Sequence, residues 1–536
     1  MRQAPASPQG LTGVRAYPSG RDQARPWFSG AEGSPEWWRR SSGREPEFFT
    51  ITTRGRAEPV TQGGARQGQP SQVPGTPPSR GGNLAAARRG LFRPASLLRA
   101  EVRLWGRQIG AVVWDEGREL GVFEYDPRFL ASGIEVAPLT LPLRSGVFDF
   151  PALSRDTFKG LPGLLADSLP DKFGNLLIER WLAEQGRPPD SMNPVERLCY
   201  TGSRGMGALE FHPARHERGE AGAPLDIERM VGLAAEILAR RGDLAGRLDG
   251  PHQEEAMREI LQVGTSAGGA RAKAVLAWNP LTGEFRSGQI EAGSGFEHWL
   301  LKFDGVSGNA DKELADPQGY GRLEYACYLA ARQAGIQMMT ARLHEEGGRA
   351  HFMTRRFDRT AQGGRLHMLS LGAMRHFDFN LPGAYSYEQA IETIRLLRLG
   401  MATIEEQLRR AYFNLVIRNQ DDHVKNIAFL MNRDGRWRLA PAFDVTYAYN
   451  PRGAWTSQHQ MSLNGKTSGF TMSDLLAFAA FCDVKPARAR AVLEQVLGAA
   501  HNWRQHAAAA KVPAELAAGA WAGFRLDWRT ADSAGG

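Results

Sequence analysis

The stretch RNQDDHVKNIAFLMNRDGRWRLAPAFD, which ends at Asp444, constrains the fold of this chain more than any other. It holds Asp421, then Asn426 five residues later, and then an apolar segment that turns at Asp434 and Gly435. A surface loop needs only polarity and not this order. A phosphoryl-transfer site needs one carboxylate beside the attacking hydroxyl, and an amide oxygen and a second carboxylate that hold Mg²⁺.

The residues around this loop predict how it is held. Apolar residues at helical spacing in TIEEQLRRAYFNLVIRNQ predict a helix leading into the loop, and IAFLMNRDGRWRLAP predicts a β-hairpin after it. Asp421-x₄-Asn426 has the spacing of the kinase catalytic loop, in which the Asp accepts the substrate hydroxyl proton and the Asn binds Mg²⁺. Asp422, His423 and Lys425 have ordinary explanations as loop contacts or solvated charges, so we assign them no catalytic role.

A lysine and a glutamate upstream could belong to the same site. Lys302 lies in the apolar strand WLLKF, and Glu324 lies in the following predicted helix GRLEYACYLAARQAG. A strand lysine paired with a helix glutamate is how kinases hold the α- and β-phosphates of ATP. The alternative is that Glu324 pairs with Arg322 or Arg332 on its own helix, and spacing does not decide between the two.

The glycine-rich stretch VGTSAGGARAK fits neither of the two common phosphate-binding glycine motifs. We expect a strand, a glycine turn and a second strand, with EILQV forming the first strand. Gly268 and Gly269 would let backbone N–H groups approach a nucleotide phosphate closely, because no side chain intervenes. The alternative is that this stretch forms a mobile hairpin that does not bind phosphate.

The patterning divides the chain into four parts. We predict a disordered Arg/Gly/Pro-rich extension at 1–95 and a β-rich subdomain at 96–215 that opens with a β-meander near Val102. A β-rich small lobe follows at 226–356, and a mostly helical large lobe at 357–536. A β-rich part followed by a helical part is the order of a two-lobed kinase, so the expected fold class is α+β.

The net charge of +8 is typical of a nucleic-acid-binding protein, but the distribution of the charge along the chain argues against that function. Residues 1–99 hold 15 arginines, no lysine and six acidic residues, a net charge of +9, so the rest of the chain is close to neutral. We therefore favour an unstructured extension, or translation that starts further downstream, over an RNA-binding arm. Deletion of residues 1–95 is expected to leave activity intact. Three scattered cysteines and no membrane-spanning apolar run fit a cytoplasmic protein.

Several segments together resemble one family, the HipA-type serine/threonine kinases, which are the toxins of type II toxin–antitoxin modules. Eight segments carry the resemblance in this order: LWGRQIGAVVWD, GSRGMGALEF, GTSAGGARAK, WLLKF, LEYACYLAARQAGI, RRFDR, NQDDHVKNIAFL and LAPAFDVTY. Each is weak alone, but eight in order are specific, and they extend from about residue 100 into the C-terminal region.

The resemblance implies a two-lobed protein-kinase-like fold with an N-terminal β-rich subdomain, and ATP and Mg²⁺ as cofactors. It implies that Asp421 is the catalytic base, that Asn426 and Asp444 hold Mg²⁺, and that Lys302 contacts the ATP phosphates. Ser266 in the glycine-rich loop matches the family's autophosphorylated serine, with Thr265 as a second possible acceptor. Phosphate there would repel the ATP phosphates and silence the enzyme.

The resemblance also implies a partner and a substrate class. The partner is a helix-turn-helix antitoxin on a separate chain, through which the toxin meets DNA only indirectly. Family precedent suggests an aminoacyl-tRNA synthetase as the protein substrate. Two other interpretations stay open: a small-molecule phosphotransferase of the aminoglycoside type, and an ATP-binding pseudokinase module in a repressor complex. Because Lys302, Asp421, Asn426 and Asp444 are all in place, the pseudokinase interpretation is disfavoured.

Overall fold

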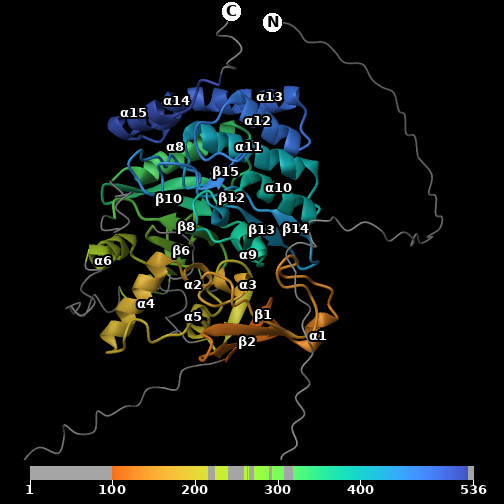
Figure 1. Cartoon of the computed structure of the whole chain (residues 1–536). Helices are drawn as coiled ribbons and strands as arrows, with labels where there is room; N and C mark the ends of the chain where they lie inside the picture. Colours follow the sequence, from red (N-terminus) through yellow and green to blue (C-terminus); the bar gives the residue numbers. More distant parts are fainter. Residues whose placement is uncertain are drawn as a thin grey trace, which may run out of the picture. The chain divides into compact units, whose positions relative to one another are not determined.

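The computed structural model describes residues 99–214, 224–239, 257, 259–261, 263–264, 271–288, 293–306, 318–360 and 363–528. The chain divides into two compact units, Met1–Arg89 and Gly90–Gly536, and every described residue belongs to the second. The extension predicted at 1–95 therefore lies outside the described residues. Sheets and helices both build the described part, which confirms the mixed α and β class (Figure 1).

An antiparallel five-stranded sheet opens this unit, in the order β4-β3-β2-β1-β5. Its strands are β1 (Arg99–Leu104), β2 (Arg107–Asp115), β3 (Leu120–Tyr125), β4 (Val147–Phe148) and β5 (Leu209–His212). The chain passes from β1 to β2 through Trp105 and Gly106, which both have positive φ, 52° and 80°. That is the conformation of a two-residue type I′ hairpin turn. The β-meander predicted near Val102 is confirmed.

Five helices accompany this sheet. They are α1 (Pro127–Leu130), α2 (Arg155–Phe158), α3 (Gly163–Ala166), α4 (Lys172–Glu184) and α5 (Pro194–Thr201). Helix α4 begins after Asp171, whose side chain accepts a hydrogen bond from the Gly174 N–H and so caps the helix. This cap fixes the position of the Asp171 carboxylate, which bears on the site below.

A second five-stranded sheet has the order β7-β6-β8-β10-β9, with β8 at its centre. Its strands are β6 (Lys273–Trp278), β7 (Phe285–Ser287), β8 (Glu297–Lys302), β9 (Ala341–Glu346) and β10 (Arg349–Arg355). Helix α6 (Ile227–Ala239) precedes the sheet, and α8 (Tyr320–Gln333) lies between β8 and β9 in the chain. Helix α8 approaches β10 so closely that a Cβ added at Gly321 would lie 2.0 Å from the Ala350 carbonyl oxygen. Glycine is therefore required there.

The strand predicted for EILQV is wrong, because the described residues from Met257 to Gly264 are helical. Met257, Ile260, Leu261 and Gly264 recur at helical spacing and are buried. A Cβ at Gly264 would lie 2.7 Å from a Leu177 methyl carbon, so this helical segment packs against α4. The short apolar run EILQV is compatible with both the two-residue period of a strand and the 3.6-residue period of a helix. The contact with α4 favours the helix.

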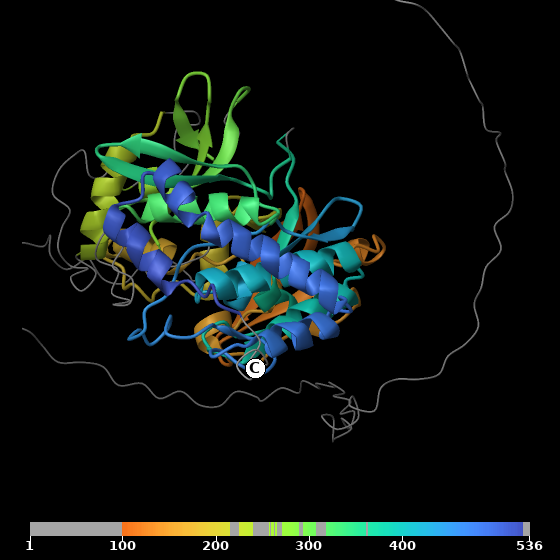
Figure 2. The same cartoon turned by 90° about the horizontal axis from the view of Figure 1, so that it is seen from above.

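The remaining chain is mostly helical, as predicted. It contains α9 (Leu371–Arg375), α10 (Tyr387–Leu396), α11 (Met401–Ile417), the 3₁₀ turn η2 (Val424–Asn426), α12 (Met472–Phe481), α13 (Pro486–His501), α14 (Trp503–Ala509) and α15 (Ala514–Gly523). Its strands are β11 (His367–Ser370), β12 (Tyr385–Ser386), β13 (Ala428–Met431), β14 (Trp437–Leu439) and β15 (Met461–Ser462). Strands β13 and β14 form the predicted hairpin. Helix α13 packs against α11, α12 and α8, as Figure 2 shows from above.

One hydrophobic core joins the first sheet to the helical part. The same buried cluster contains Val102 and Phe123 from the first sheet, Leu323 from α8, and Leu408 and Phe413 from α11. A second cluster joins α4 and α6 to the second sheet. The boundaries predicted between subdomains are therefore crossed by continuous apolar packing among the described residues.

A buried ion cluster reinforces this junction. The Asp358 carboxylate accepts hydrogen bonds from Arg356 at 2.7 and 2.9 Å, from Arg359 at 2.7 Å, and from the Gly207 N–H at 2.7 Å. Burial alone would raise the pKa of Asp358, but the two guanidinium groups lower it well below its usual range. The segments RRFDR and GSRGMGALEF therefore meet in space, and their residues hold the subdomains together.

Candidate functional site

Helix α11 delivers the polar loop at 418–427 to the site. The helix ends at Arg418, which has the left-handed conformation with φ of 54°. The Gln420 N–H then donates to the Ala448 carbonyl at 3.0 Å, and the Ala448 N–H donates back to the Arg418 carbonyl at 3.1 Å. This backbone pairing ties the start of the loop to the segment that follows Asp444.

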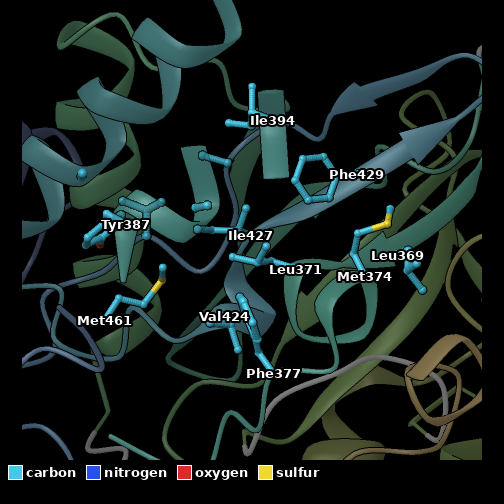
Figure 3. Close-up of a cluster of buried hydrophobic side chains, with 14 of the residues drawn as sticks. Leu369, Leu371, Met374, Phe377, Tyr387, Ile394, Val424, Ile427, Phe429 and Met461 are labelled. Atoms are coloured by element: carbon cyan, nitrogen blue, oxygen red, sulfur yellow. The ribbon is translucent and has the colours of Figure 1, made fainter. Parts of the chain in front are cut away.

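The far end of the loop is held by apolar side chains. Val424 and Ile427 are 2% and 7% exposed and belong to the main core. Figure 3 shows them beside Leu371, with Tyr387 and Met461 nearby. The Leu371 N–H also donates to the Ile427 carbonyl at 2.7 Å. The polar residues between these anchors are therefore presented from a rigid base.

Asp421 is the exposed carboxylate of the loop. Its side chain is 38% exposed, and its Oδ1 accepts a hydrogen bond from the Trp455 indole N–H at 2.7 Å. His423 Nε2 lies 3.8 Å from the same oxygen. The Asn426 side-chain N–H₂ donates to the Asp421 carbonyl at 2.8 Å, so its amide oxygen is not used in that bond. The first and last members of the predicted Asp-x₄-Asn pattern therefore lie together.

Asp422 points the opposite way, into the protein. Its buried carboxylate accepts hydrogen bonds from the Tyr387 hydroxyl at 2.7 Å, from His459 Nδ1 at 2.7 Å and from the Gln460 N–H at 2.8 Å. His459 Nε2 in turn lies 3.1 Å from Arg525 Nη1. Burial and the Asp422 carboxylate raise the pKa of Tyr387 well above its usual value. Asp422 therefore positions the loop, a role that the sequence did not reveal.

The predicted pair of Lys302 and Glu324 is present. Lys302 Nζ lies 2.5 Å from Glu324 Oε1 and also forms an ion pair with Asp444 Oδ1. Glu324, at 2% exposure, has a second partner in Arg271 Nη1 at 3.4 Å. The alternative partners are engaged elsewhere, since Arg322 pairs with Glu345 and Arg332 donates to the Met338 carbonyl.

The charges of this cluster stabilise one another. Burial alone would lower the pKa of Lys302, but the Asp444 and Glu324 carboxylates outweigh it and hold the pKa above its usual value. Burial alone would raise the pKa of Asp444, but Lys302 and Lys273 lower it to about 2. Lys302 is therefore cationic and Asp444 anionic at neutral pH.

Asp444 has a left-handed backbone conformation, which is uncommon for residues other than glycine. Its φ is 53°, and the Asn419 side chain donates to its carbonyl at 3.2 Å. An Asp tolerates this left-handed conformation better than most residues. Asp444 and Asn426 line one small cavity, together with Asn419 and Asp422. The predicted hairpin therefore returns Asp444 to the loop that carries Asn426.

The donors in this cavity fit a hard divalent cation. Mg²⁺ prefers oxygen ligands and usually takes one or two protein carboxylates, with waters and substrate phosphates completing its shell. Asp444 supplies an ionised carboxylate and Asn426 an amide oxygen. Among the described residues, no group of three or more His, Cys, Asp or Glu side chains has metal-binding spacing. Ser266, Thr265, Gly268 and Gly269, predicted to cover or regulate the phosphates, lie outside the described residues.

Two residues that sequence reasoning missed also belong to this site. Trp455 contacts Asp421 from a segment with no regular pattern, so no sequence signal pointed to it. Lys273 is the last residue of the stretch VGTSAGGARAK and the first residue of β6, and it is 2% exposed. A lysine inside the apolar run AKAVLAW was the signal that could have found it.

Comparison with known proteins gives matches along most of the described chain. Residues 100–212 match the model of the HipA N-terminal domain, and residues 265–504 match that of the HipA-like C-terminal domain. The structure is similar to that of the HipA toxin from Shewanella oneidensis MR-1, solved in complex with HipB and its operator DNA. That likeness has a TM-score of 0.54 at 18% identity, and covers 79% of this chain and 94% of the other.

A second structural match is much weaker. It is to the proinflammatory kinase CtkA of Helicobacter pylori, with a TM-score of 0.27 at 12% identity, and covers 42% of this chain and 91% of the other. The likeness to the Shewanella protein is the one that shows the fold. Within the described residues, no helix combines the length and the apolar character needed to cross a membrane.

Proposed function

Because this chain belongs to the family of HipA-type toxins, we propose that it is a Mg-ATP-dependent serine/threonine protein kinase and the toxin of a toxin–antitoxin module. The observation that carries the proposal is the ion pair of Lys302 with Glu324, joined to Asp444 beside the Asp421 loop. A kinase needs a paired lysine, a metal-binding carboxylate and a base in one place.

Each side chain has one task in this mechanism. Asp421 accepts the proton of the attacking hydroxyl, and the Trp455 indole holds its carboxylate in a fixed orientation. Lys302 neutralises charge on the nucleotide phosphates, and Glu324 keeps its ammonium group in place. Asn426 and Asp444 hold Mg²⁺, which when bound neutralises charge on the transferring phosphoryl group. Asp422 stays buried and holds the loop in one conformation through its hydrogen bond from Tyr387.

The proposed regulation and partners follow the family. Ser266, with Thr265 beside it, is the proposed site of autophosphorylation, and the added charge would exclude the ATP phosphates. The Shewanella relative was solved with HipB and operator DNA. We therefore propose that this chain also binds a separate antitoxin, and that it contacts DNA only through that antitoxin. The proposed substrate is a protein of the aminoacyl-tRNA synthetase class, and the proposed compartment is the cytoplasm, where ATP and such a substrate are present.

The test is phosphate incorporation by purified full-length protein, measured by intact mass and phosphopeptide analysis after incubation with Mg-ATP. The wild type should gain phosphate on the segment that contains Ser266. Asp421→Asn keeps a group that accepts the Trp455 hydrogen bond but removes the base, so the rate should fall by about 10²- to 10⁴-fold. Asp434→Asn, an exposed aspartate in the β13–β14 turn, is the matched control and should behave as the wild type.

A wild type that binds ATP but transfers no phosphate to protein would contradict the proposal. Labelled phosphate appearing on small molecules instead would favour the aminoglycoside-type phosphotransferase. ATP binding with no transfer to any acceptor would favour the pseudokinase module. Equal rates for the wild type and Asp421→Asn would remove Asp421 as the base.

A further inference from the structure

Two buried lysines lie side by side at the candidate nucleotide site. Lys273 on β6 is directly opposite Lys302 on β8 in the antiparallel register, so their side chains share one face of the sheet. They are 2% and 8% exposed. Like charges opposite each other on one face repel, so the arrangement needs anions on that face. Lys302 has Glu324 and Asp444, while the anion beside Lys273 comes from a distant part of the chain.

That anion is Asp171, in the part that matches the HipA N-terminal domain. Its Oδ2 lies 3.4 Å from Lys273 Nζ, and both side chains are 3% exposed. Its Oδ1 accepts the Gly174 N–H at 2.6 Å as the cap of α4. The helix therefore fixes one carboxylate oxygen, which aims the other at a lysine in the part that matches the HipA-like C-terminal domain.

Holding an ionised carboxylate at this position is costly to the protein. Burial raises the pKa of Asp171 to about 6, although Lys273, the Gly174 N–H and Lys425 of the loop all act to lower it. Buried ion pairs often add little to stability, because desolvation offsets the attraction. A pair kept at such a cost, beside a site built for phosphates, is better explained by function than by stability.

Lys273 is adjacent to the groups assigned to the nucleotide site. Its cross-strand neighbour Lys302 forms an ion pair with Asp444, and its counter-ion Asp171 belongs to the N-terminal part. Lys273 therefore lies between the N-terminal part and the reacting groups. A lysine side chain is long and flexible, so a fixed counter-ion is needed to keep it in one place.

We propose that Lys273 is a second phosphate-contacting lysine of the nucleotide site, and that Asp171 is the positioning residue by which the N-terminal part holds it there. This inference rests on the proposed function, because it needs a nucleoside triphosphate in the site. It assigns to the N-terminal part a direct contribution to nucleotide affinity. A purely structural ion pair between the two parts is the competing explanation.

The test measures KM for ATP, kcat and the thermal unfolding temperature for the full chain. Asp171→Asn keeps the helix cap, because Asn caps as well as Asp, but it removes the charge. Lys273→Met removes the ammonium group at similar volume. Each should raise KM for ATP by about ten- to hundredfold, the effect of losing one charge-assisted hydrogen bond, with a smaller change in kcat.

A double-mutant cycle decides whether Asp171 acts through Lys273. In the Lys273→Met background, Asp171→Asn should cause no further rise in KM. The double variant also removes both buried charges together, so it stays measurable if Asp171→Asn alone fails to fold. Asp126→Asn is the matched control, because Asp126 caps α1 in the same part of the chain but pairs with the exposed Arg128. It should leave KM for ATP unchanged.

The outcomes separate this inference from the proposed function. A wild type that neither binds Mg-ATP nor transfers phosphate overturns both. A working wild type whose KM is unchanged in Asp171→Asn and Lys273→Met overturns the inference alone, and a lower unfolding temperature in those variants would then mark a structural pair. Additive KM effects in the cycle would remove Asp171 as a positioning residue for Lys273.

Discussion

Asp421 and Asp422 are adjacent in the chain, yet their carboxylates have opposite environments. Asp421 is 38% exposed and accepts one hydrogen bond from Trp455, whereas Asp422 is buried and accepts three. The spacing to Asn426 singled out Asp421 as the candidate base, and its carboxylate is the more exposed of the two. It could not identify Trp455 or Asp171, because their contacts join segments that are far apart in the sequence.

Trp455 gives a prediction at this scale. Trp455→Phe keeps an aromatic ring but removes the N–H that orients the Asp421 carboxylate, so kcat should fall about tenfold with KM for ATP unchanged. Steady-state kinetics measure both values. Trp437→Phe is the control, because the Trp437 indole donates only to the Glu135 carbonyl at 3.3 Å. If kcat is the same in the wild type and Trp455→Phe, the indole does not orient the base.

At the scale of elements, the loop is held by both of its neighbours. Helix α11 leads in through a left-handed residue, and the hairpin β13–β14 returns the chain to Asp444. Between them, Asp422 connects the loop to Tyr387 on α10 and to the segment around His459. The loop therefore depends on the network around Asp422 for its conformation.

Asp422→Asn should be strongly destabilising. An amide has one acceptor oxygen instead of two and brings an extra N–H₂ into a buried site, so we expect a loss of about 2–4 kcal/mol in the free energy of unfolding. Urea denaturation monitored by tryptophan fluorescence measures it. Asp421→Asn, one residue away and exposed, should change stability by less than about 0.5 kcal/mol. Equal losses in the two variants would contradict the role assigned to Asp422.

The elements also show where prediction from sequence succeeds. The meander, helix α8, helix α11 and the hairpin each have an apolar pattern long enough to distinguish a helix from a strand. The segment EILQV failed because a short apolar run fits both a strand and a helix. The deciding contact, Gly264 against Leu177, involves a helix from another part of the chain.

At the scale of the whole molecule, two histidines form hydrogen bonds between parts that were separate predictions from the sequence. His367 Nε2 on β11 lies 2.9 Å from the Val136 carbonyl, and His376 Nε2 accepts the Gly163 N–H at 3.0 Å. Burial lowers the pKa of both side chains to about 4, and it does the same for His298 and His351. These four histidines are therefore neutral in the folded protein at pH 6.

This neutrality predicts acid sensitivity. Between pH 6.5 and 4 the unfolded chain binds more protons than the folded one at these histidines, so stability falls as pH falls. At pH 5, His351 and His367 together should cost about 2–4 kcal/mol relative to pH 7.5. Asp171 acts in the opposite sense, because its raised pKa lets the folded state bind a proton between about pH 6 and 3.8. The histidines should prevail because there are four of them.

Urea denaturation at pH 5 and pH 7.5 measures this loss. His367→Gln keeps a donor for the Val136 carbonyl but cannot be protonated, so it should reduce the loss of stability at pH 5. His501→Gln is the control, because His501 is exposed, and it should keep the full loss. A loss that is unchanged in His367→Gln would show that other groups cause the acid sensitivity.

The continuous core has a consequence for how this protein is removed. Val102 and Phe123 share one apolar cluster with Leu408 and Phe413, so the first sheet and the helical part lose their packing together. A protease that unfolds the chain from either end therefore leaves no folded remnant with a complete site. Turnover of this protein should therefore be all or none, and degradation should leave no partly active fragment.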